Sequence, residues 1–277
     1  MFNRVAIIGV GLIGGSLGLA LKKKRLAKRI IGVARHKRSV LEAKKLNAID
    51  EGSLDVRKAL KNADLAVFAT PALSISSLIS NNKRSIKRGA VLMDVASTKE
   101  AILKKIENTV PKNTAFVGAH PLAGSEKNGV RYANADLFKN SICILTRTKK
   151  TNAAAFNKMA KLWKLLGARV VVLSAPAHDK ILAQVSHLPH IVAVALIKAV
   201  DRNSLKFAAG GFRDTTRIAA GEPAMWRDIC LTNKAKLVKA IDRYVKAIAQ
   251  LRKDIAGGNS TELMRRFSNA KNIRDSI

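Results

Sequence analysis

A glycine motif near the start of the chain sets the strongest limit on its fold. Gly9, Gly11 and Gly14 form the pattern G-x-G-x-x-G, directly after an apolar run at 4–8 and at the start of an apolar stretch with helical spacing. Gly9 allows a tight turn, Gly11 lets the backbone approach a pyrophosphate, and Gly14 lets helix and strand pack closely. The pattern therefore predicts a dinucleotide-binding unit with NAD(P) as cofactor. We also assign cofactor contacts to Leu12, Ile13, Thr70 and Pro71.

The first part of the chain alternates short apolar runs with polar helical segments. Continuous apolar runs are typical of parallel strands buried on both faces, and alternation with helices indicates an α/β fold with a doubly wound, Rossmann-type sheet. The expected strands are 4–8, 29–34, 64–70, 90–96, 115–119, 142–146 and 169–173.

Beyond residue 173 the apolar strand-like runs stop, and helical patterns take over. They cover 177–201 (interrupted at the sequence HLPH), 203–220 (broken near Gly210), 223–256 and about 260–270. We predict a dinucleotide-binding domain at 1–173 and an all-α substrate and dimerisation domain at 174–277. The apolar stretch at 191–200 is a candidate for a homodimer interface.

The end of the second expected strand bears on which nicotinamide dinucleotide is bound. An NAD site usually has a carboxylate there, to bind the ribose hydroxyls. This chain has Arg35, Lys37 and Arg38 instead, which could bind a 2′-phosphate. We predict a slight preference for NADP over NAD. Both remain open, because basic residues occur along the whole chain.

The chain is unusually basic, with 51 Lys+Arg against 19 Asp+Glu and a net charge of +32. The basic residues are spread along the sequence, aromatic residues make up only 4%, and no zinc-finger spacing occurs. A basic solvated surface is therefore favoured over a nucleic-acid-binding function. An anionic small-molecule substrate fits the same charge.

Two cysteines and the N-terminal residues bear on the location of the protein. Cys143 and Cys230 lie far apart without metal-ligand spacing, so we expect free thiols and no metal site. The chain starts without a signal-peptide pattern, and no apolar run reaches the length needed to span a bilayer. These observations predict a cytoplasmic protein with no membrane association.

The stretch GAHPLAGSE, 118–126, places a histidine among small residues, since six of its nine residues are Gly, Ala, Ser or Pro. His120 follows one expected strand and Ser97 follows another. Ligands of a Rossmann fold bind outside the carboxyl ends of its strands, so both side chains should face the nicotinamide. A histidine there can accept the proton of a substrate hydroxyl while hydride leaves for the cofactor.

Six motifs in order, GVGLIGGS, DVASTK, GAHPLAGSE, SHLPH, GGFRDTTRIA and EPAMWRDI, resemble those of the prephenate and arogenate dehydrogenases of tyrosine biosynthesis. The resemblance covers nearly the whole chain. It implies oxidative decarboxylation of a cyclohexadienol, with His120 accepting the hydroxyl proton and Ser97 hydrogen-bonding that hydroxyl and the imidazole. It also implies that Arg217 binds the ring carboxylate, and that the protein is a homodimer.

Further residues are assigned through the same resemblance. Arg213, Gly210 and His190 are expected at the substrate, and Glu126 at the mouth of the site, where a plain surface glutamate is an equal alternative. His187 and His178 are interpreted as structural. Trp226 is expected at a subunit or domain interface.

The substrate is expected to be prephenate, because His190, Arg213 and the positive field suit a side chain without an amino group. Arogenate is the alternative. A β-hydroxyacid dehydrogenase with a catalytic Lys180 is a second alternative, and a basic, nucleotide-sensing nucleic-acid binder is a remote third.

Overall fold

An eight-stranded sheet forms the centre of the N-terminal part of the protein. The computed structural model describes all residues except 108, 126 and 148–150. The strand order is β3-β2-β1-β4-β5-β6-β7-β8, and every neighbouring pair is parallel except β6 with β7. The strands are β1 (Phe2–Ile8), β2 (Ala27–Val33), β3 (Glu51–Ser53), β4 (Leu65–Phe68), β5 (Val91–Asp94), β6 (Ala115–Pro121), β7 (Ile142–Thr146) and β8 (Arg169–Val172).

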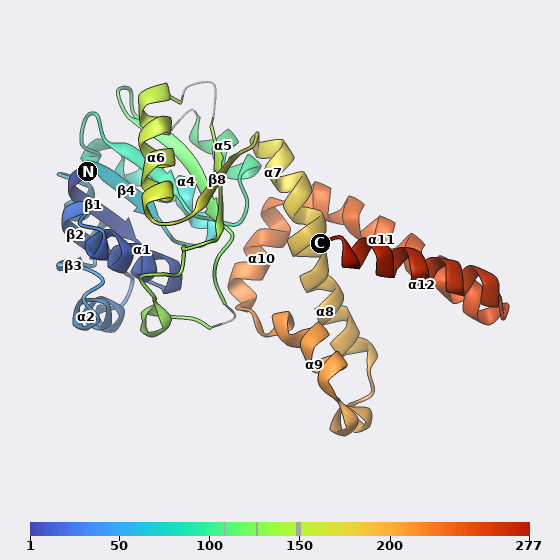
Figure 1. Ribbon diagram of the computed structural model, residues 1–277. Coiled ribbons are helices and arrows are strands. Elements are labelled where there is room, and N and C mark those ends of the chain that lie inside the picture. Colours follow the sequence, from blue (N-terminus) through green and yellow to red (C-terminus); the bar gives the residue numbers. More distant parts are fainter. Residues whose placement is uncertain (108, 126, 148–150) are drawn as a thin grey trace.

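Helices cover both faces of this sheet (Figure 1). One apolar core lies under α1 and α6 and includes the fully buried Trp163, whereas the second lies under α3, α4 and α5. The sheet is therefore doubly wound, which confirms the predicted Rossmann-type architecture. The helices of this part are α1 (Leu12–Lys23), α2 (Lys37–Lys45), α3 (Val56–Leu60), α4 (Ala72–Asn82), η1 (Lys83–Ser85), α5 (Glu100–Ile106), η2 (Val130–Tyr132) and α6 (Ala153–Leu165).

The chain after β8 is entirely helical and extends away from the sheet (Figure 1). Ser174 caps the first helix by accepting a hydrogen bond from the backbone N–H of Ala177. The helices are α7 (Ala175–Leu182), η3 (Ala183–His187, a π-helix), α8 (Leu188–Ala199), η4 (Arg202–Phe207), α9 (Gly210–Thr216), η5 (Arg217–Ala220), α10 (Pro223–Thr232), α11 (Lys234–Ala256) and α12 (Ser260–Asp275).

Two features of the sheet differ from the sequence prediction. The edge strand β3 was missed, because Glu51–Ser53 is only three residues long and has no apolar side chain. The predicted parallel sheet is confirmed except at β7, which runs antiparallel to β6. The only helix among the described residues of 122–141 is the short η2, so this segment lacks the α-helix that usually makes a parallel crossover.

The helical part also differs in where its helices are interrupted. The sequence HLPH does not break the helix, because Pro189 lies in the first turn of α8, where its missing N–H costs nothing. The irregularity is the π-helix η3 just before it. The expected helix at 223–256 is divided at Asn233 into α10 and α11.

From the sequence we expected no apolar run long enough to span a bilayer, but the helical run from α7 to α8 has that length and composition. Ala175–Ala199 forms 25 helical residues with a mean hydropathy of 1.5 in its most apolar window, of which only 28% is buried. By length and composition alone it could cross a membrane. Among its exposed side chains are Val185, Val194 and Ile197, so the chain leaves an apolar helix face uncovered.

Candidate active site

The glycine motif forms a cradle between β1 and α1. Gly9 has a φ of 101°, and a Cβ there would lie 2.4 Å from the Ala69 carbonyl oxygen. A Cβ on Gly14 would lie 1.9 Å from the Gly9 carbonyl oxygen, so only glycine fits at either position. At Gly11, by contrast, a Cβ would meet none of the described residues within 4 Å. The motif is thus tightly packed except at Gly11, where space is left for a ligand.

The surroundings of this cradle suit a pyrophosphate. Gly11 is the N-cap of α1, and Leu12 and Ile13 begin the helix. No side chain of the described residues caps that end. The backbone N–H groups of this first turn are therefore free to bind an anion. The methyl group of Thr70 lies 3.1 Å from the position of a Gly9 Cβ, and Pro71 is the N-cap of α4. The residues present therefore fit a dinucleotide.

The end of β2 has basic side chains and no carboxylate. β2 ends at Val33, and Arg35, Lys37 and Arg38 are all exposed beyond it. The Arg35 guanidinium makes no hydrogen bond or ion pair with the described residues. It can therefore reach a group bound beyond β2.

A chain of buried side chains starts at His120, near the carboxyl end of β6. His120 Nδ1 lies 2.8 Å from His178 Nε2, and His178 Nδ1 lies 2.7 Å from Asp179 Oδ1. The two carboxylate oxygens of Asp179 also accept hydrogen bonds from the backbone N–H groups of Lys99 and Glu100, at 2.8 and 2.9 Å. These bonds fix His178 and Asp179, both on α7, against the segment that follows β5.

These contacts determine the protonation state of both imidazoles. An ionised Asp179 only accepts, so His178 Nδ1 carries the hydrogen and His178 Nε2 is an acceptor. His120 Nδ1 must then donate to His178, which leaves a free lone pair on His120 Nε2. His120 Nε2 makes no hydrogen bond within the described residues, and the atom is not buried. The arrangement presents a general base to the crevice.

The pKa values support this assignment. Burial, together with the charges of His178 and Lys99, holds the pKa of His120 well below its usual 6.5, so the imidazole is neutral at pH 7. Burial would raise the pKa of Asp179, but the hydrogen bonds from His178 and from the backbone of Glu100 outweigh it and lower that pKa. A neutral base and an ionised acceptor are thus both present.

A buried ion pair lies beside this chain of contacts. Lys99 and Asp94 are both completely buried, and Lys99 Nζ pairs with Asp94 Oδ2. A Cβ on Gly118 would lie 3.1 Å from Lys99 Cδ, so a glycine in β6 makes room for the lysine stem. The positive charge of Lys99 opposes protonation of His120. It therefore helps to keep the base unprotonated.

The helical part supplies the opposite wall. Asn128, in the segment after β6, donates a hydrogen bond of 2.8 Å to Glu222 before α10. His190 on α8 is buried and stacks on Trp226, with ring centroids 3.4 Å apart and an interplanar angle of 9°. Its Nδ1 is buried without a hydrogen-bond partner in the described chain. An acceptor or donor on a bound molecule would satisfy it.

The remaining predicted site residues lie at varying distances from this centre. Arg217 begins η5. The next residue, Ile218, forms a backbone hydrogen bond with the His190 ring. Gly210 and Arg213 are exposed on α9, where Arg213 Nε donates to the Ala208 carbonyl at 3.1 Å. No hydrogen bond joins half-buried Ser97 to His120 in the described structure. Glu126 lies outside the described residues.

Several residues of the site were not found from the sequence. His178 was interpreted as structural, yet it is the direct partner of His120, and Asp179 was not singled out. Their adjacency was the available signal, since a His-Asp pair opening a helix can orient another imidazole. His187 instead lies 3.1 Å from Asn233 Nδ2, away from His120. Lys180 is exposed, which removes support for a catalytic lysine there.

The two cysteines are free thiols, as expected. Cys143 is buried on β7 opposite Pro121, and burial raises the pKa of its thiol. Among the described residues no three His, Cys, Asp or Glu side chains are grouped to hold a metal ion.

A dinucleotide cradle and a buried base, closed by a helical domain, define an NAD(P)-dependent oxidoreductase. Models of two protein domains match the chain: the prephenate dehydrogenase nucleotide-binding domain over residues 17–172 and the prephenate dehydrogenase dimerization domain over residues 174–269. The chain belongs to the prephenate dehydrogenase family.

Individual relatives agree with this membership. Prephenate dehydrogenase of Bacillus subtilis is 37% identical over 284 residues, covering 100% of this chain and 76% of that protein. Cyclohexadienyl dehydrogenase of Zymomonas mobilis is 33% identical, covering 99% of this chain and 96% of that protein. The crystal structure of prephenate dehydrogenase from Aquifex aeolicus with hydroxyphenyl propionate and NAD+ is 33% identical, with a TM-score of 0.92, covering 99% of this chain and 98% of that one.

Proposed function

We propose that this protein converts prephenate to 4-hydroxyphenylpyruvate in the biosynthesis of L-tyrosine. The observation that carries the proposal is the orientation of His120, whose Nδ1 is held by His178 while Nε2 is left free at the carboxyl end of β6. A nicotinamide dinucleotide whose pyrophosphate is held in the Gly9–Gly14 cradle would supply the hydride acceptor when it is bound. The protein itself must position the substrate and accept one proton.

Proton transfer begins at the substrate hydroxyl. As the carbinol C–H bond gives up its hydride, the hydroxyl proton passes to His120 Nε2 and the carbinol becomes a carbonyl. Cleavage of the bond between the ring and its carboxylate then releases carbon dioxide, and the ring becomes aromatic. The imidazolium formed on His120 is stabilised through His178 by the negative charge of Asp179.

Substrate binding falls to the helical wall. We propose that Arg217 binds the ring carboxylate, because a guanidinium can form a bidentate pair with it. His190, whose buried Nδ1 has no partner among the described residues, is proposed to contact the substrate side chain. Gly210 and Arg213 are proposed to lie beside that same side chain of the substrate. Ser97 and Glu126 are proposed at the hydroxyl and at the mouth of the site, on the family resemblance alone.

Prephenate is proposed over arogenate because the helical wall presents basic groups and the chain has a large positive charge. An amino group on the substrate side chain would be repelled there. The relative from Zymomonas mobilis is a cyclohexadienyl dehydrogenase, which is consistent with arogenate as the alternative. NADP is proposed over NAD on the exposed Arg35 beyond β2.

The experiment is to follow dinucleotide reduction optically with prephenate or arogenate, each with NAD or NADP. The proposal expects the fastest rate with prephenate and NADP. His120→Asn should lower kcat by about 10²–10⁴, typical of a lost general base. Lys180→Ala is the matched control, since this lysine is exposed on α7, and it should retain the rate. Absence of reduction in all four mixtures, by folded protein that binds dinucleotide, would refute the proposal.

Three wider predictions accompany this function. We propose a domain boundary between Leu173 and Ser174, supported by the end of β8 at Val172 and the start of α7 at Ala175. We interpret the exposed apolar face of α8 as the homodimer contact rather than a membrane span, since the same run buries His178 and Asp179. Cytoplasmic location stays a prediction.

A further inference from the structure

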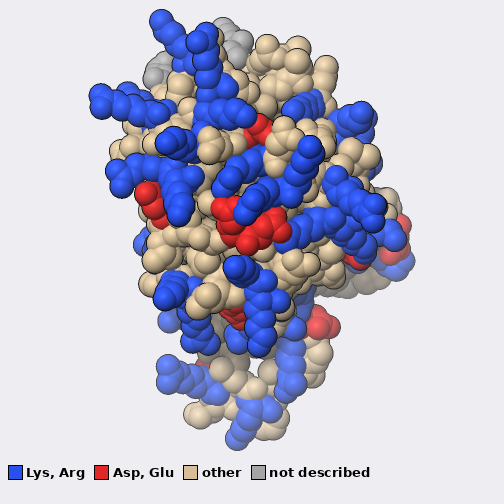
Figure 2. All heavy atoms as spheres, turned by 90° about the vertical axis from the view of Figure 1, so that its left-hand side faces the viewer, with Lys and Arg blue, Asp and Glu red and all other residues tan. Residues whose placement is uncertain are grey.

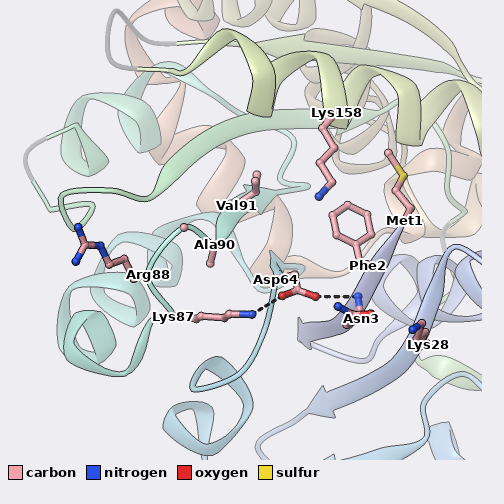
Figure 3. A pocket seen from close by; sticks show the side chains of 11 residues that line it. Met1, Phe2, Asn3, Lys28, Asp64, Lys87, Arg88, Ala90, Val91 and Lys158 are labelled. Carbon is pink, nitrogen blue, oxygen red and sulfur yellow. Dashed lines mark hydrogen bonds and ion pairs between the residues drawn. The ribbon is translucent and has the colours of Figure 1, made fainter.

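A basic cavity lies at the end of the sheet opposite to the active site. It has a volume of about 450 Å³ and is formed by the starts of β1, β4 and β5 together with α6 (Figure 3). Phe2 lines the cavity, whereas Gly9 follows the other end of β1. At about 3.3 Å per residue, β1 separates the two sites by roughly 23 Å. A molecule in this cavity would therefore not touch the dinucleotide.

The cavity collects positive charge. Four of its lining residues are Lys or Arg, namely Lys28, Lys87, Arg88 and Lys158, and a single lining residue, Asp64, is acidic. They come from separate elements, since Lys28 is on β2, Lys158 is on α6, and the other two precede β5. The surrounding face is also rich in Lys and Arg with few acidic side chains between them (Figure 2).

The one carboxylate is already saturated. Asp64 Oδ2 accepts the backbone N–H groups of Asn3 and Arg4 at 2.8 and 3.0 Å, and Asp64 Oδ1 pairs with Lys87 at 2.6 Å (Figure 3). Lys28 and Arg88 have no hydrogen bond or ion pair within the described residues. The site thus retains a net positive charge that its own side chains do not neutralise.

The lining also limits the kind of ligand. Phe2 is only 3% exposed, and Lys158 Nζ lies 4.5 Å from its ring centroid. No aromatic face is therefore open for stacking a base, so recognition would fall on the anionic part of a ligand. A volume of this size is in the range of small-molecule sites. Several cations around one hollow favour a ligand with several adjacent charges.

We infer that this cavity is a second ligand site, which binds the phosphate chain of an oligophosphate, either inorganic triphosphate or a nucleoside triphosphate. The inference is independent of the proposed dehydrogenase reaction. Lys87 and Lys158 contact the phosphates from two sides, and Lys28 and Arg88 contribute charge at the rim. Arg88 extends away from the centre of the cavity (Figure 3), so its side chain must turn to take part.

The test is calorimetric titration with inorganic triphosphate at physiological salt, with the dinucleotide site saturated by NAD+. The expected result is saturable binding of one triphosphate per chain. The variant Lys28→Glu/Arg88→Glu, which breaks no contact in the described structure, should weaken binding at least tenfold. The control Lys271→Glu/Arg274→Glu on α12 has the same change of net charge and should stay within about twofold.

Further arms separate the sources of phosphate. Equal affinity for ATP and triphosphate identifies the phosphate chain as the ligand, and tighter ATP binding identifies a nucleotide; both support the site. Equal weakening in both double variants would show general charge attraction and overturn it. So would single-stranded RNA that binds through Lys28 and Arg88 while triphosphate does not. Dehydrogenase rates should stay unchanged in both variants, so failure here leaves the proposed function standing.

Discussion

Replacing His178 tests whether the chain of contacts behind His120 contributes to turnover. His178→Phe removes the acceptor for His120 Nδ1, which lies 2.8 Å away, and keeps an aromatic ring at a completely buried position. Asp179 retains its two backbone donors in this variant, so its charge is not left unpaired. We therefore expect the variant to fold.

The expected loss in kcat depends on the charge of His120 when its hydrogen bond to His178 is strongest. His120 is neutral before the reaction and positively charged once it has accepted the proton, and a hydrogen bond to a charged group contributes about 1.5–3 kcal/mol. Since about 1.4 kcal/mol is tenfold in rate, kcat should fall by about 10- to 150-fold. KM should change little, because His178 lies behind His120 rather than at the substrate.

The assay is steady-state dinucleotide reduction at pH 8, where His120 of the unmodified protein is neutral because its pKa lies well below 6.5. His178→Gln keeps an amide oxygen that can accept from His120, and it should recover part of the lost kcat. An unchanged kcat in His178→Phe would refute the reasoning. So would a loss that appears only in KM, or one that matches the fraction of unfolded protein.

Four other perturbations address the cofactor site and stability. A Cβ on Gly11 would point into space left by the described residues, so Gly11→Ala should leave the Tm unchanged and weaken dinucleotide binding at least tenfold by calorimetry. A Cβ on Gly14 would overlap the Gly9 carbonyl oxygen, so Gly14→Ala should lower the free energy of unfolding by about 1–3 kcal/mol. Arg35→Asp should reduce the ratio of kcat/KM with NADP to that with NAD at least tenfold. Chemical denaturation should show the free energy of unfolding falling as the pH drops from 6.5 to 4. Burial lowers the pKa of His187 to about 4 in the folded protein, so the unfolded chain takes up this proton at a higher pH than the folded one.

Each of these has a result that would count against it. Normal dinucleotide affinity in Gly11→Ala would mean that the cradle binds something else. An unchanged NADP to NAD ratio would show that Arg35 reaches no 2′-phosphate. For His187 the shift corresponds to roughly 3 kcal/mol, so a denaturation free energy that stays flat down to pH 4 would contradict the burial argument.

The parts of the fold that sequence reasoning found are those determined locally. Gly9 is required by its own positive φ, and Gly14 by its contact with Gly9 within one strand, turn and helix, so the pattern is visible in a few residues. The direction of β7 was missed because it depends on the path of the whole segment between β6 and β7. β3 was missed because it is held by pairing with β2 rather than by apolar side chains of its own.

The same distinction holds for the site. His120 was found because it stands in a loop of small residues at a strand end, which is a local signal. His178 lies 58 residues further along the chain, and only the packing of α7 against the sheet brings it within hydrogen-bonding distance. The Asp94–Lys99 pair was likewise hidden, since burial of a lysine depends on the room that Gly118 leaves for it.

The π-helix at Ala183–His187 sets the alignment of the helical wall. A π turn holds one more residue than an α turn, so these five residues turn the chain about as far as four α-helical residues would. Rewinding them as α-helix at the same length would rotate all that follows by about 100° relative to α7. His190 would turn away while His178 stayed in place. Removing one of the five residues would restore α-helical winding and keep that alignment, so a single deletion should disturb the helical wall less here than in the neighbouring turns.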